Sequence, residues 1–513
     1  MFGTCWSPRV PHLLAALIAL GILPVSACST AAPPSRHLLI VVDGLRPDYV
    51  TPRVMPHLSA LGARGVVFAR HHAVFPTVTR VNASSFSTGA YPQVHGLMGN
   101  AVYFPNVDGA AFLDTGDRQA LERVAQIEGR LLTTGTISEV LQGAERRMLV
   151  VSSGSTGSAF LNNHTLAGGA ILHHAFTLPD EWRAAMRVIG PPPSEGAARA
   201  EFDRYAVDAF LRVGLPDVDP SVTVLWLGAL DATAHARGVG AAETIDVLRR
   251  VDGEIARVLE GLQAMHLLDD YNIWVTSDHG FSTHTGGAPV DAVLAPFVGT
   301  LPDGSPRIVA QGGAIYVRDD DRAAVAGIVR GLQQTPGVGA IFTRSVRADS
   351  FDGVVPGTLS FEAARWNHDR AAHILFSPDW TDGTNPHGFS GTTASGGTAG
   401  HGSTSPWDIH NTLIAAGPDL LAGVTVETPS GNVDFAPTFL HLLGIARPSS
   451  MQGRVLQDAL VAPAAAGSPA VRSFEHEVST PDGAYRLTAS FSVVSSGGRE
   501  YRYLDGTRVE RAP

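Results

Sequence analysis

Four apolar runs divide the first half of the chain, at residues 37–43, 147–152, 222–228 and 272–278. Runs of this kind are typical of strands that are buried on both faces of a parallel sheet. Helix-like stretches separate them, for example at 117–127 and 241–265. Strands that alternate with helices predict an α/β fold, a three-layer sandwich around a largely parallel central sheet.

The pattern changes after residue 282. Residues 283–398 carry short strand-like segments and turn residues, with a Gly-, Ser- and Thr-rich stretch at 388–405. We interpret 283–398 as an inserted cap subdomain whose glycine-rich end forms a mobile loop. Because the core pattern returns at 410–417 and in a predicted helix at 435–444, we expect the core in two parts, 37–282 and 399–461.

The last segment, 462–513, begins with an Ala-, Pro- and Gly-rich linker at 462–469. Strand-like residues follow from 471 to 508, and Ser496-Gly-Gly498 is typical of a hairpin turn. We therefore predict a strand-rich C-terminal tail.

Residues 1–28 resemble an export signal, because Arg9 and His12 precede an apolar run at 13–25. That run is shorter than the roughly 20 residues that span a bilayer. Val-Ser-Ala-Cys28 resembles a lipobox, whose Cys carries lipid and becomes the first mature residue, and an ordinary cleaved signal peptide is the alternative. Ser29 does not resemble an inner-membrane retention signal. We expect an exported lipoprotein of the bacterial periplasm or outer membrane, attached through lipid on Cys28 and a tether at 29–36.

The composition excludes several classes of protein. The 513 residues exceed the roughly 250–300 at which a single core stops growing, and 44% hydrophobic residues exclude disorder. All 37 basic residues are Arg, which excludes Schiff-base chemistry and a lysine clamp on phosphate. The net charge of -11 disfavours binding of nucleic-acid polymers. The two Cys, Cys5 and Cys28, leave no disulfide for the mature monomer, so its core and bound metal are the candidates for stabilising it.

Residues of the types that bind metals lie at the ends of three of the predicted strands. Asp43 ends the first run, Asp231 follows the third, and Asp278 with His279 ends the fourth. In open α/β sheets, ligands bind outside the carboxyl ends of the strands. We therefore expect these side chains to meet in one crevice.

Three further candidates lie outside those strand ends. His235 follows Asp231 by four residues, which places both on one face of a helical turn. His401 comes after the start of the glycine-rich stretch, and Thr79 precedes a predicted helix at 82–88 whose N-terminal amides would face an anion. Imidazole and carboxylate ligands with a Thr hydroxyl suit two zinc-like ions about 3.5–4 Å apart.

Each of these signals is weak by itself. A single strand-end Asp is more often a turn or capping residue. Several other His residues are interpreted as surface groups or as supports for the ligands rather than as ligands. They are His71, His72, His173, His174 and His284. The Ser-rich stretch at 152–157 lacks the Lys and the order of a P-loop, and we interpret it as a turn that lines the cleft.

Five segments occur in the order of a known family. They are Val-Val-Asp43-Gly-Leu-Arg-Pro-Asp, Phe-Pro-Thr-Val-Thr79 with its continuation to Asn100, Asp231-Ala-Thr-Ala-His235, Asp278-His279-Gly280 and His401-Gly402. The chain thereby resembles the nucleotide pyrophosphatase/phosphodiesterase family of the alkaline phosphatase superfamily, over most of residues 37–445. The resemblance implies an alkaline-phosphatase-like fold and two Zn²⁺ ions, with other divalent metals possible.

The resemblance also implies residue roles. Asp231, His235 and His401 would hold one zinc, and Asp43, Asp278 and His279 would hold the other. Thr79 would be both a ligand of the second zinc and the nucleophile that forms a phosphothreonine. Asn100 would donate its amide to a phosphoryl oxygen, together with the backbone N–H of Thr79.

Some alternatives stay open. Thr77 competes with Thr79 as nucleophile, although its spacing to Asn100 fits the family less well. The family usually has Phe-Pro-Asn where this chain has Arg80-Val81-Asn82, which puts the substrate pocket in doubt. Arg46 and Arg80 are candidate phosphate contacts, but each is more typical of a structural ion pair or surface residue.

The leading hypothesis is hydrolysis of phosphodiester or pyrophosphate bonds in small nucleotide-type phosphate esters. The same site in a phosphomonoesterase or phosphonate hydrolase is the alternative, and the absence of a phosphate-binding Lys favours the diesterase. A sulfatase is disfavoured because Arg-Val-Asn follows Thr79 in place of that class's motif. The remaining alternative is a surface lipoprotein that keeps the fold for binding.

Overall fold

The computed structural model describes residues 1–6, 36–461 and 469–512. The predicted lipid attachment at Cys28 and most of the predicted signal, tether and linker lie outside these ranges. Arg36, which we assigned to the tether, is the first residue of strand β1 (Arg36–Val42). No helix in the described part of the chain is both long and apolar enough to cross a membrane.

A nine-stranded sheet forms the centre of the protein, in the order β21-β2-β20-β10-β1-β9-β6-β7-β8. The five strands from β10 to β7 run parallel, whereas β20 and β8 are antiparallel to their neighbours. The predicted, largely parallel α/β sheet is confirmed. The remaining strands are β2 (Val66–Phe68), β6 (Met148–Ser152), β7 (Ala170–His173), β8 (Phe176–Leu178), β9 (Val222–Leu227), β10 (Tyr271–Thr276), β20 (Leu413–Ala416) and β21 (Val424–Val426).

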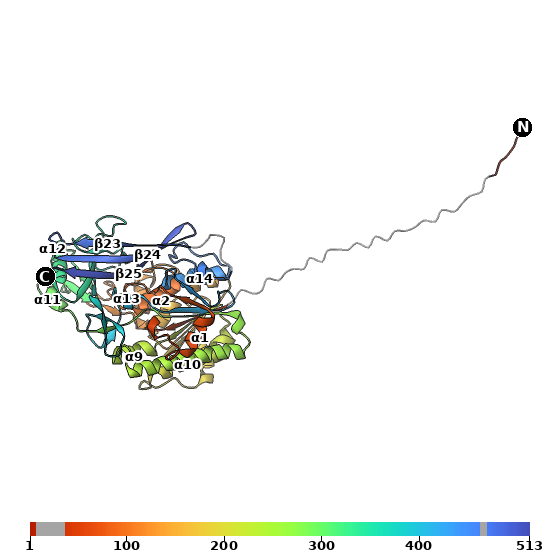
Figure 1. Ribbon diagram of the computed structural model, residues 1–513, viewed down its shortest axis with the longest axis horizontal. Coiled ribbons are helices and arrows are strands. Elements are labelled where there is room, and N and C mark those ends of the chain that lie inside the picture. The colour runs from red at the N-terminus through yellow and green to blue at the C-terminus, as the bar shows by residue number, and fades with distance from the viewer. Residues whose placement is uncertain (7–35, 462–468, 513) are drawn as a thin grey trace. The chain divides into compact units, whose positions relative to one another are not determined.

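Strand β1 is buried on both faces because helices cover both sides of the sheet. Leu38 and Ile40 belong to one hydrophobic cluster, and Leu39 and Val41 belong to another. The first cluster includes residues of α1 (Pro56–Arg64), α8 (Arg199–Ala209), α9 (Ala229–Arg237) and α10 (Ala242–Ala264). The second includes residues of α2 (Thr79–Thr88), α4 (Arg118–Glu128), α5 (Ile137–Gly143), α6 (Thr156–Asn162) and α14 (Phe435–Leu442). Figure 1 shows α1, α9 and α10 together on one side of the sheet.

The region predicted as a cap contains two smaller sheets. One has the order β12-β13-β16-β14-β15, and the other has the order β17-β18-β11-β19. Ile341 and Phe342 of β14 belong to the same hydrophobic cluster as Leu39 of the central sheet, so this region shares a core with it. The elements are β11 (Ser282–His284), α11 (Val290–Leu294), β12 (Ile308–Gln311), β13 (Ala314–Val317), α12 (Arg322–Gln334), β14 (Val338–Thr343), β15 (Leu359–Ser360), β16 (Ile374–Pro378), β17 (Trp380–Thr384), β18 (Ser390–Thr393) and β19 (Ala399–Gly400).

The C-terminal tail is an antiparallel sheet of β23 (Ala470–Ser479), β24 (Tyr485–Ser496) and β25 (Arg499–Arg511). Gly497 and Gly498 join β24 to β25 with φ angles of 56° and 74°, a left-handed conformation that favours glycine. The predicted strand-rich tail is therefore confirmed. Leu487 and Phe491 of β24 are fully buried in the cluster that contains Leu39. The long strands of this sheet lie together along one side of the protein (Figure 1).

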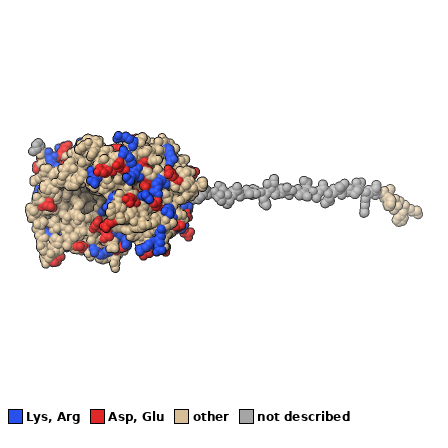
Figure 2. Space-filling model, turned by 90° about the horizontal axis from the view of Figure 1, so that it is seen from below, with Lys and Arg blue, Asp and Glu red and all other residues tan. Residues whose placement is uncertain are grey.

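Charged side chains of both signs are intermixed on one face of the protein. On the face shown in Figure 2, Arg side chains lie among Asp and Glu side chains, beside a hollow that other residue types line. Mixed charge of this kind produces no strong field of one sign on this face.

Candidate active site

Three adjacent parallel strands bring the predicted carboxylates to one edge of the central sheet. Asp43 follows β1, Asp278 follows β10, and Asp231 lies in α9 directly after β9. Because the order of these strands is β10-β1-β9, their carboxyl ends are neighbours. Gly44 then turns the chain with a φ of +77°, and a Cβ there would lie 2.9 Å from the ring of Phe281. This position therefore requires glycine.

One group of ligand-type side chains consists of Asp231, His235 and His401. Asp231 and His235 lie one turn apart in α9, and His401 follows β19. Asp231 Oδ1 lies 3.3 Å from Nε2 of His235 and 3.4 Å from Nε2 of His401. The His235 side chain is 43% exposed, so this group is open to solvent.

The second group consists of Asp43, Asp278 and His279, and it is buried. His279 Nε2 lies 3.1 Å from Asp278 Oδ2 and 3.5 Å from Asp43 Oδ1. The groups adjoin, because Asp231 also offers an oxygen within 4.8 Å of the ligand atoms of Asp43 and His279. The rings of His279 and His401 stack with their centroids 3.4 Å apart. The structure thus brings all six predicted ligands together.

The three imidazoles are held in the form that binds a metal. Nδ1 of His235, His279 and His401 lies 2.9, 2.9 and 2.8 Å from the carbonyl oxygens of Ala399, Gly280 and Thr77, respectively. A carbonyl oxygen only accepts, so each Nδ1 must carry the proton. In the neutral form of each ring, Nε2 therefore presents its lone pair to the site, as metal-bound histidines do.

Three buried carboxylate oxygens at the same place have no hydrogen-bond partner among the described residues: Asp43 Oδ1, Asp231 Oδ1 and Asp278 Oδ2. The other oxygens of two of these groups are bonded, since Trp226 Nε1 donates to Asp43 Oδ2 (2.9 Å) and the Gly44 amide donates to Asp278 Oδ1 (3.2 Å). A buried carboxylate without a partner costs free energy that a bound cation offsets. The donor set of imidazole nitrogens and carboxylate oxygens therefore fits two zinc ions.

The electrostatics of the carboxylates also favour a bound cation. Burial raises the pKa of Asp43 well above its usual value, and the neighbouring Asp278 and Asp231 carboxylates raise it further. Burial also raises the pKa of Asp231, but the neighbouring imidazoles of His235 and His401 outweigh this effect, and the net pKa is lowered. Three carboxylates crowded together without a cation repel one another.

Thr79 is the first residue of α2, which begins there and not at residue 82 as we predicted. The helix extends to Thr79 because Val78, in an extended conformation, takes the capping position. Thr79 Oγ1 lies 3.3 Å from His279 Nε2, and the side chain is buried. The hydroxyl therefore lies beside the second group of ligands and at the N-terminus of a helix.

Thr77, the competing candidate, has a different environment. Its hydroxyl donates to the Ser403 carbonyl (2.8 Å) and accepts from the Gly402 amide (3.1 Å). Its carbonyl accepts from Nδ1 of His401. Thr77 therefore anchors the segment that carries His401, and both functions of its hydroxyl are already used.

Asn100 lies beside the start of α2. Its Oδ1 accepts from the Arg80 amide at 3.0 Å, and its own carbonyl accepts from both the amide (3.0 Å) and the hydroxyl (2.7 Å) of Thr115. These bonds fix the residue next to Thr79 and leave Nδ2, a donor, for another partner. Arg46 forms an ion pair with Asp48 and donates to the carbonyl of Phe281, which is a structural role.

Sequence reasoning missed Asn432, a buried residue behind the site. Its Nδ2 donates to the carbonyl of Asp278 and to Oδ1 of Asn82, both at 2.9 Å. Its Oδ1 lies 2.9 Å from Nε2 of His71, which is fully buried and is not a surface residue. Asn432 thereby connects the metal-binding end of β10 to the first turn of α2. No motif or spacing in the sequence signals this contact.

Asp203 was also missed. Its Oδ1 accepts from the hydroxyl of Ser153 (2.6 Å) and from the amides of Gly228 (3.1 Å) and Ala229 (3.3 Å), at the start of α9. Ser153 belongs to the Ser-rich turn after β6, so this turn supports the helix that carries Asp231.

Curated relatives are similar to about half of the chain. Ectonucleotide pyrophosphatase/phosphodiesterase family member 7 of Mus musculus is 27% identical over 278 residues, which are 52% of this chain and 54% of that protein. Family member 1 of Homo sapiens is 26% identical over 246 residues, 47% of this chain and 23% of that protein. The chain thus spans about half the length of the first of these relatives and less of the second.

Solved structures share the fold. Human ectonucleotide pyrophosphatase/phosphodiesterase 5 superposes with a TM-score of 0.60 at 17% identity, covering 83% of this chain and 100% of that one. An inactive variant of the murine protein, in complex with AMP, has a TM-score of 0.58 at 17% identity, with the same coverage. A mutant of the alkaline phosphatase PafA has a TM-score of 0.64 at 16% identity, covering 84% and 100%. The expected alkaline-phosphatase-like fold is confirmed.

The family model of type I phosphodiesterases and nucleotide pyrophosphatases matches residues 37–381. The match spans well over half of the chain and contains all but one of the six candidate ligands, His401 lying beyond it. The chain therefore belongs to the type I phosphodiesterase/nucleotide pyrophosphatase family.

Proposed function

We propose that the protein is a two-zinc hydrolase that cleaves phosphodiester or pyrophosphate bonds in small nucleotide-type substrates. The observation that supports this most is the Thr79 hydroxyl, which lies 3.3 Å from His279 within the six-ligand cluster and at the start of α2. The family of the chain and the AMP bound to a structural relative support the same substrate class.

The ligands divide into two sets. Asp231, His235 and His401 would hold one ion, and Asp43, Asp278 and His279, with Thr79, would hold the other. When bound, two such ions neutralise charge on the transferring phosphoryl group and make hydroxyl and water oxygens better nucleophiles at neutral pH.

The residues of the chain then carry the two displacements. Thr79 Oγ1, after losing its proton to solvent, attacks phosphorus in line, and the bond to the leaving oxygen breaks. The products of this step are a phosphothreonine and the departing alcohol or phosphate. In the second step, water adds its oxygen to phosphorus, the bond to Oγ1 breaks, and Oγ1 recovers a proton.

The chain has no Lys to bind the phosphoryl oxygens. Nδ2 of Asn100 and the backbone amide of Thr79 are the donors that lie beside the Thr79 hydroxyl, so we assign them this role. Preorganised donors of this type each contribute on the order of 10²–10³-fold to turnover.

We also propose that the protein is exported and attached to the membrane by lipid on Cys28. The support is the lipobox-like Val-Ser-Ala-Cys28 after an apolar run. Mass spectrometry of a membrane fraction tests this, and Cys28→Ala should move the protein to the soluble fraction.

Turnover of three nitrophenyl esters tests the proposed activity: a phosphate diester, a phosphate monoester and a thymidine nucleotide ester. We expect the diester and the nucleotide ester to be cleaved faster than the monoester, with activity lost after chelation and restored by zinc. Faster cleavage of the monoester would instead support the alternative of a phosphomonoesterase with the same site. If the protein neither cleaved these substrates nor bound metal, the result would support the alternative of a binding protein that keeps the fold.

A further inference from the structure

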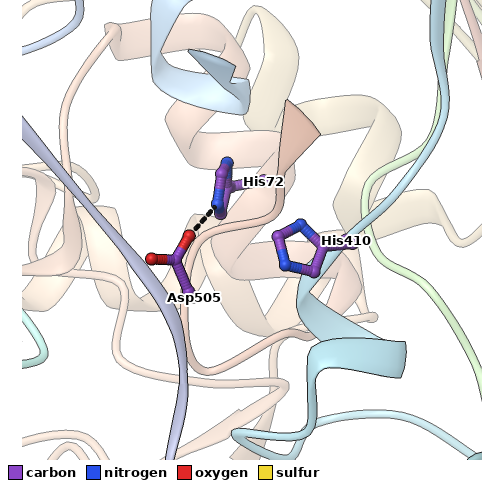
Figure 3. A group of neighbouring side chains, drawn as sticks. All are labelled: His72, His410 and Asp505. Carbon is purple, nitrogen blue, oxygen red and sulfur yellow. Dashed lines mark hydrogen bonds and ion pairs between the residues drawn. The ribbon is translucent and has the colours of Figure 1, made fainter. Parts of the chain in front are cut away.

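A second group of metal-ligand side chains lies outside the proposed active site. It consists of His72 at the end of β3 (His71–His72), His410 directly after α13 (Pro406–Ile409), and Asp505 in β25. Each residue offers a ligand atom, and these atoms lie within 4.8 Å of one another. Figure 3 shows the three side chains coming from separate segments toward one point. We call this group the tail cluster.

His72 is held in the same form as the proposed active-site ligands. Its Nδ1 lies 2.8 Å from the carbonyl oxygen of Ser430, so Nδ1 carries a proton. Its Nε2 faces Asp505 Oδ1 at 2.8 Å (Figure 3). In a neutral His72 both of these atoms present lone pairs, and such a contact is stable only with a proton or a cation between them.

Asp505 is oriented by its neighbours. The hydroxyl of Ser492 lies 2.9 and 2.8 Å from the two carboxylate oxygens, and a guanidinium nitrogen of Arg70 lies 3.8 Å from Oδ1. Ligating carboxylates commonly have such hydrogen-bond support. The guanidinium partly balances the carboxylate charge, so a cation would compete with Arg70 for Oδ1.

His410 provides the second imidazole and an opening to solvent. Its ring centroid lies 4.6 Å from that of His72. The unprotonated form of this ring offers a lone pair to a cation. His410 and Asp505 line a hollow of about 510 Å³, which also contains the carboxylates of Glu475 and Glu510. Water has access to the cluster from this hollow.

We propose that His72, His410 and Asp505 form a third binding site for a divalent cation of the zinc class, with water as the fourth ligand. Two imidazoles and one carboxylate with an open fourth position are a common zinc set. Nε2 of His72 and Oδ1 of Asp505 would separate from 2.8 Å to about 3.3 Å around a shared ion with bonds of roughly 2.0–2.1 Å.

The ion would connect the C-terminal sheet to the core. Strand β25 carries Asp505, whereas His72 and His410 belong to segments next to the central sheet. The two Cys of the chain, Cys5 and Cys28, both precede β1, so no disulfide makes this connection. Metal binding of this type contributes directly to folding stability.

Metal content of the purified full chain tests the site. After saturation with zinc and removal of loose metal, wild type should hold one equivalent more than either Asp505→Asn or His410→Gln. His410→Gln leaves the His72–Asp505 contact in place, so it separates loss of an ion from loss of that pair. Asp352→Asn is the matched control, because Asp352 pairs with His476 of β23 at 2.9 Å and the described residues offer no third ligand there.

Equal metal content in wild type and both variants would overturn the proposal and leave a proton-mediated His72–Asp505 pair. Thermal unfolding gives an independent readout, since added zinc should raise the Tm of wild type and of Asp352→Asn by more than that of the two cluster variants. The test does not depend on the proposed catalysis. If the active site bound no metal, wild type would still hold one equivalent and the cluster variants none.

Discussion

At the scale of single residues, the environments of two nearby threonines separate their roles. Thr77 uses its hydroxyl and its carbonyl to hold the segment of Gly402, Ser403 and His401. Within the described part of the chain, the Thr79 hydroxyl has a single contact, 3.3 Å to His279 Nε2, so it is directed at the ligand cluster. The side chain with unused hydrogen-bonding capacity is the better nucleophile.

We expect Thr79→Ala to reduce turnover on the order of 10⁴-fold or more, because no other hydroxyl replaces the nucleophile. Metal content and Tm should stay close to wild type, since all six imidazole and carboxylate ligands remain. Steady-state kinetics with metal analysis measures both. Thr77→Ala is the control, and it should loosen His401 and lower the metal content. If Thr77→Ala removed turnover while Thr79→Ala stayed active, Thr79 would not be the nucleophile.

A second prediction at this scale concerns Asp203. Burial raises its pKa to about 7, because its hydrogen bonds from Ser153, Ala229 and Gly228 only partly compensate for burial. The folded pKa lies above the unfolded value of about 3.9. The folded state therefore loses stability as the pH rises from about 4 to about 7, and the full cost is present above pH 7.

Asp203→Asn removes this charge and keeps an oxygen for the same donors. Its Tm relative to wild type should therefore be higher at pH 8 than at pH 5, as differential scanning calorimetry can measure. The comparison at each pH uses the same metal concentration. Identical Tm differences at the two pH values would show that Asp203 is not the titrating group.

At the scale of elements, the site depends on how strand ends and helix starts are joined. Long apolar runs identified β1, β6, β9 and β10, because strands covered on both faces need no polar alternation. Five of the six candidate ligands could be proposed from the sequence because they form short local motifs after β1, β9 and β10. The contacts of Asn432 and Trp226 could not be predicted, because they join residues more than 150 positions apart and depend on strand order.

Asn432→Ala should lower kcat by about 10²-fold with little change in KM, because it uncouples Asp278 from the first turn of α2 and shifts Thr79 relative to its phosphorus target. Asn272→Ala is the matched control. Asn272 is a fully buried residue of β10 that bonds Asp419, far along the strand from Asp278. Both variants should lose stability, but only Asn432→Ala should lose kcat; an equal loss of kcat in both would assign the effect to general destabilisation.

At the scale of the whole protein, the active site joins segments from most of the chain. Asp43 and His401 are far apart in sequence, yet both contribute to one cluster beside a shared core. The sequence pattern predicted the α/β fold and the strand-rich tail. It did not predict that one hydrophobic cluster continues from the central sheet into the sheets of residues 283–398 and the tail, because apolar runs do not reveal their partners.

Removal of metal should therefore affect the stability of the whole protein as well as its activity. Without cations, three buried carboxylate oxygens at the active site have no partner among the described residues. A ligand that binds only the folded state adds about 4 kcal/mol at 1,000 times its Kd. Chelation should lower the Tm, and zinc should restore it. His235→Ala should show a smaller rise in Tm on zinc addition, because one ion loses a ligand. His284→Ala should behave as wild type, because its Nδ1 bonds the carbonyl of Gly396 outside both ligand groups. A Tm that ignores both chelator and zinc would contradict metal occupancy of the site.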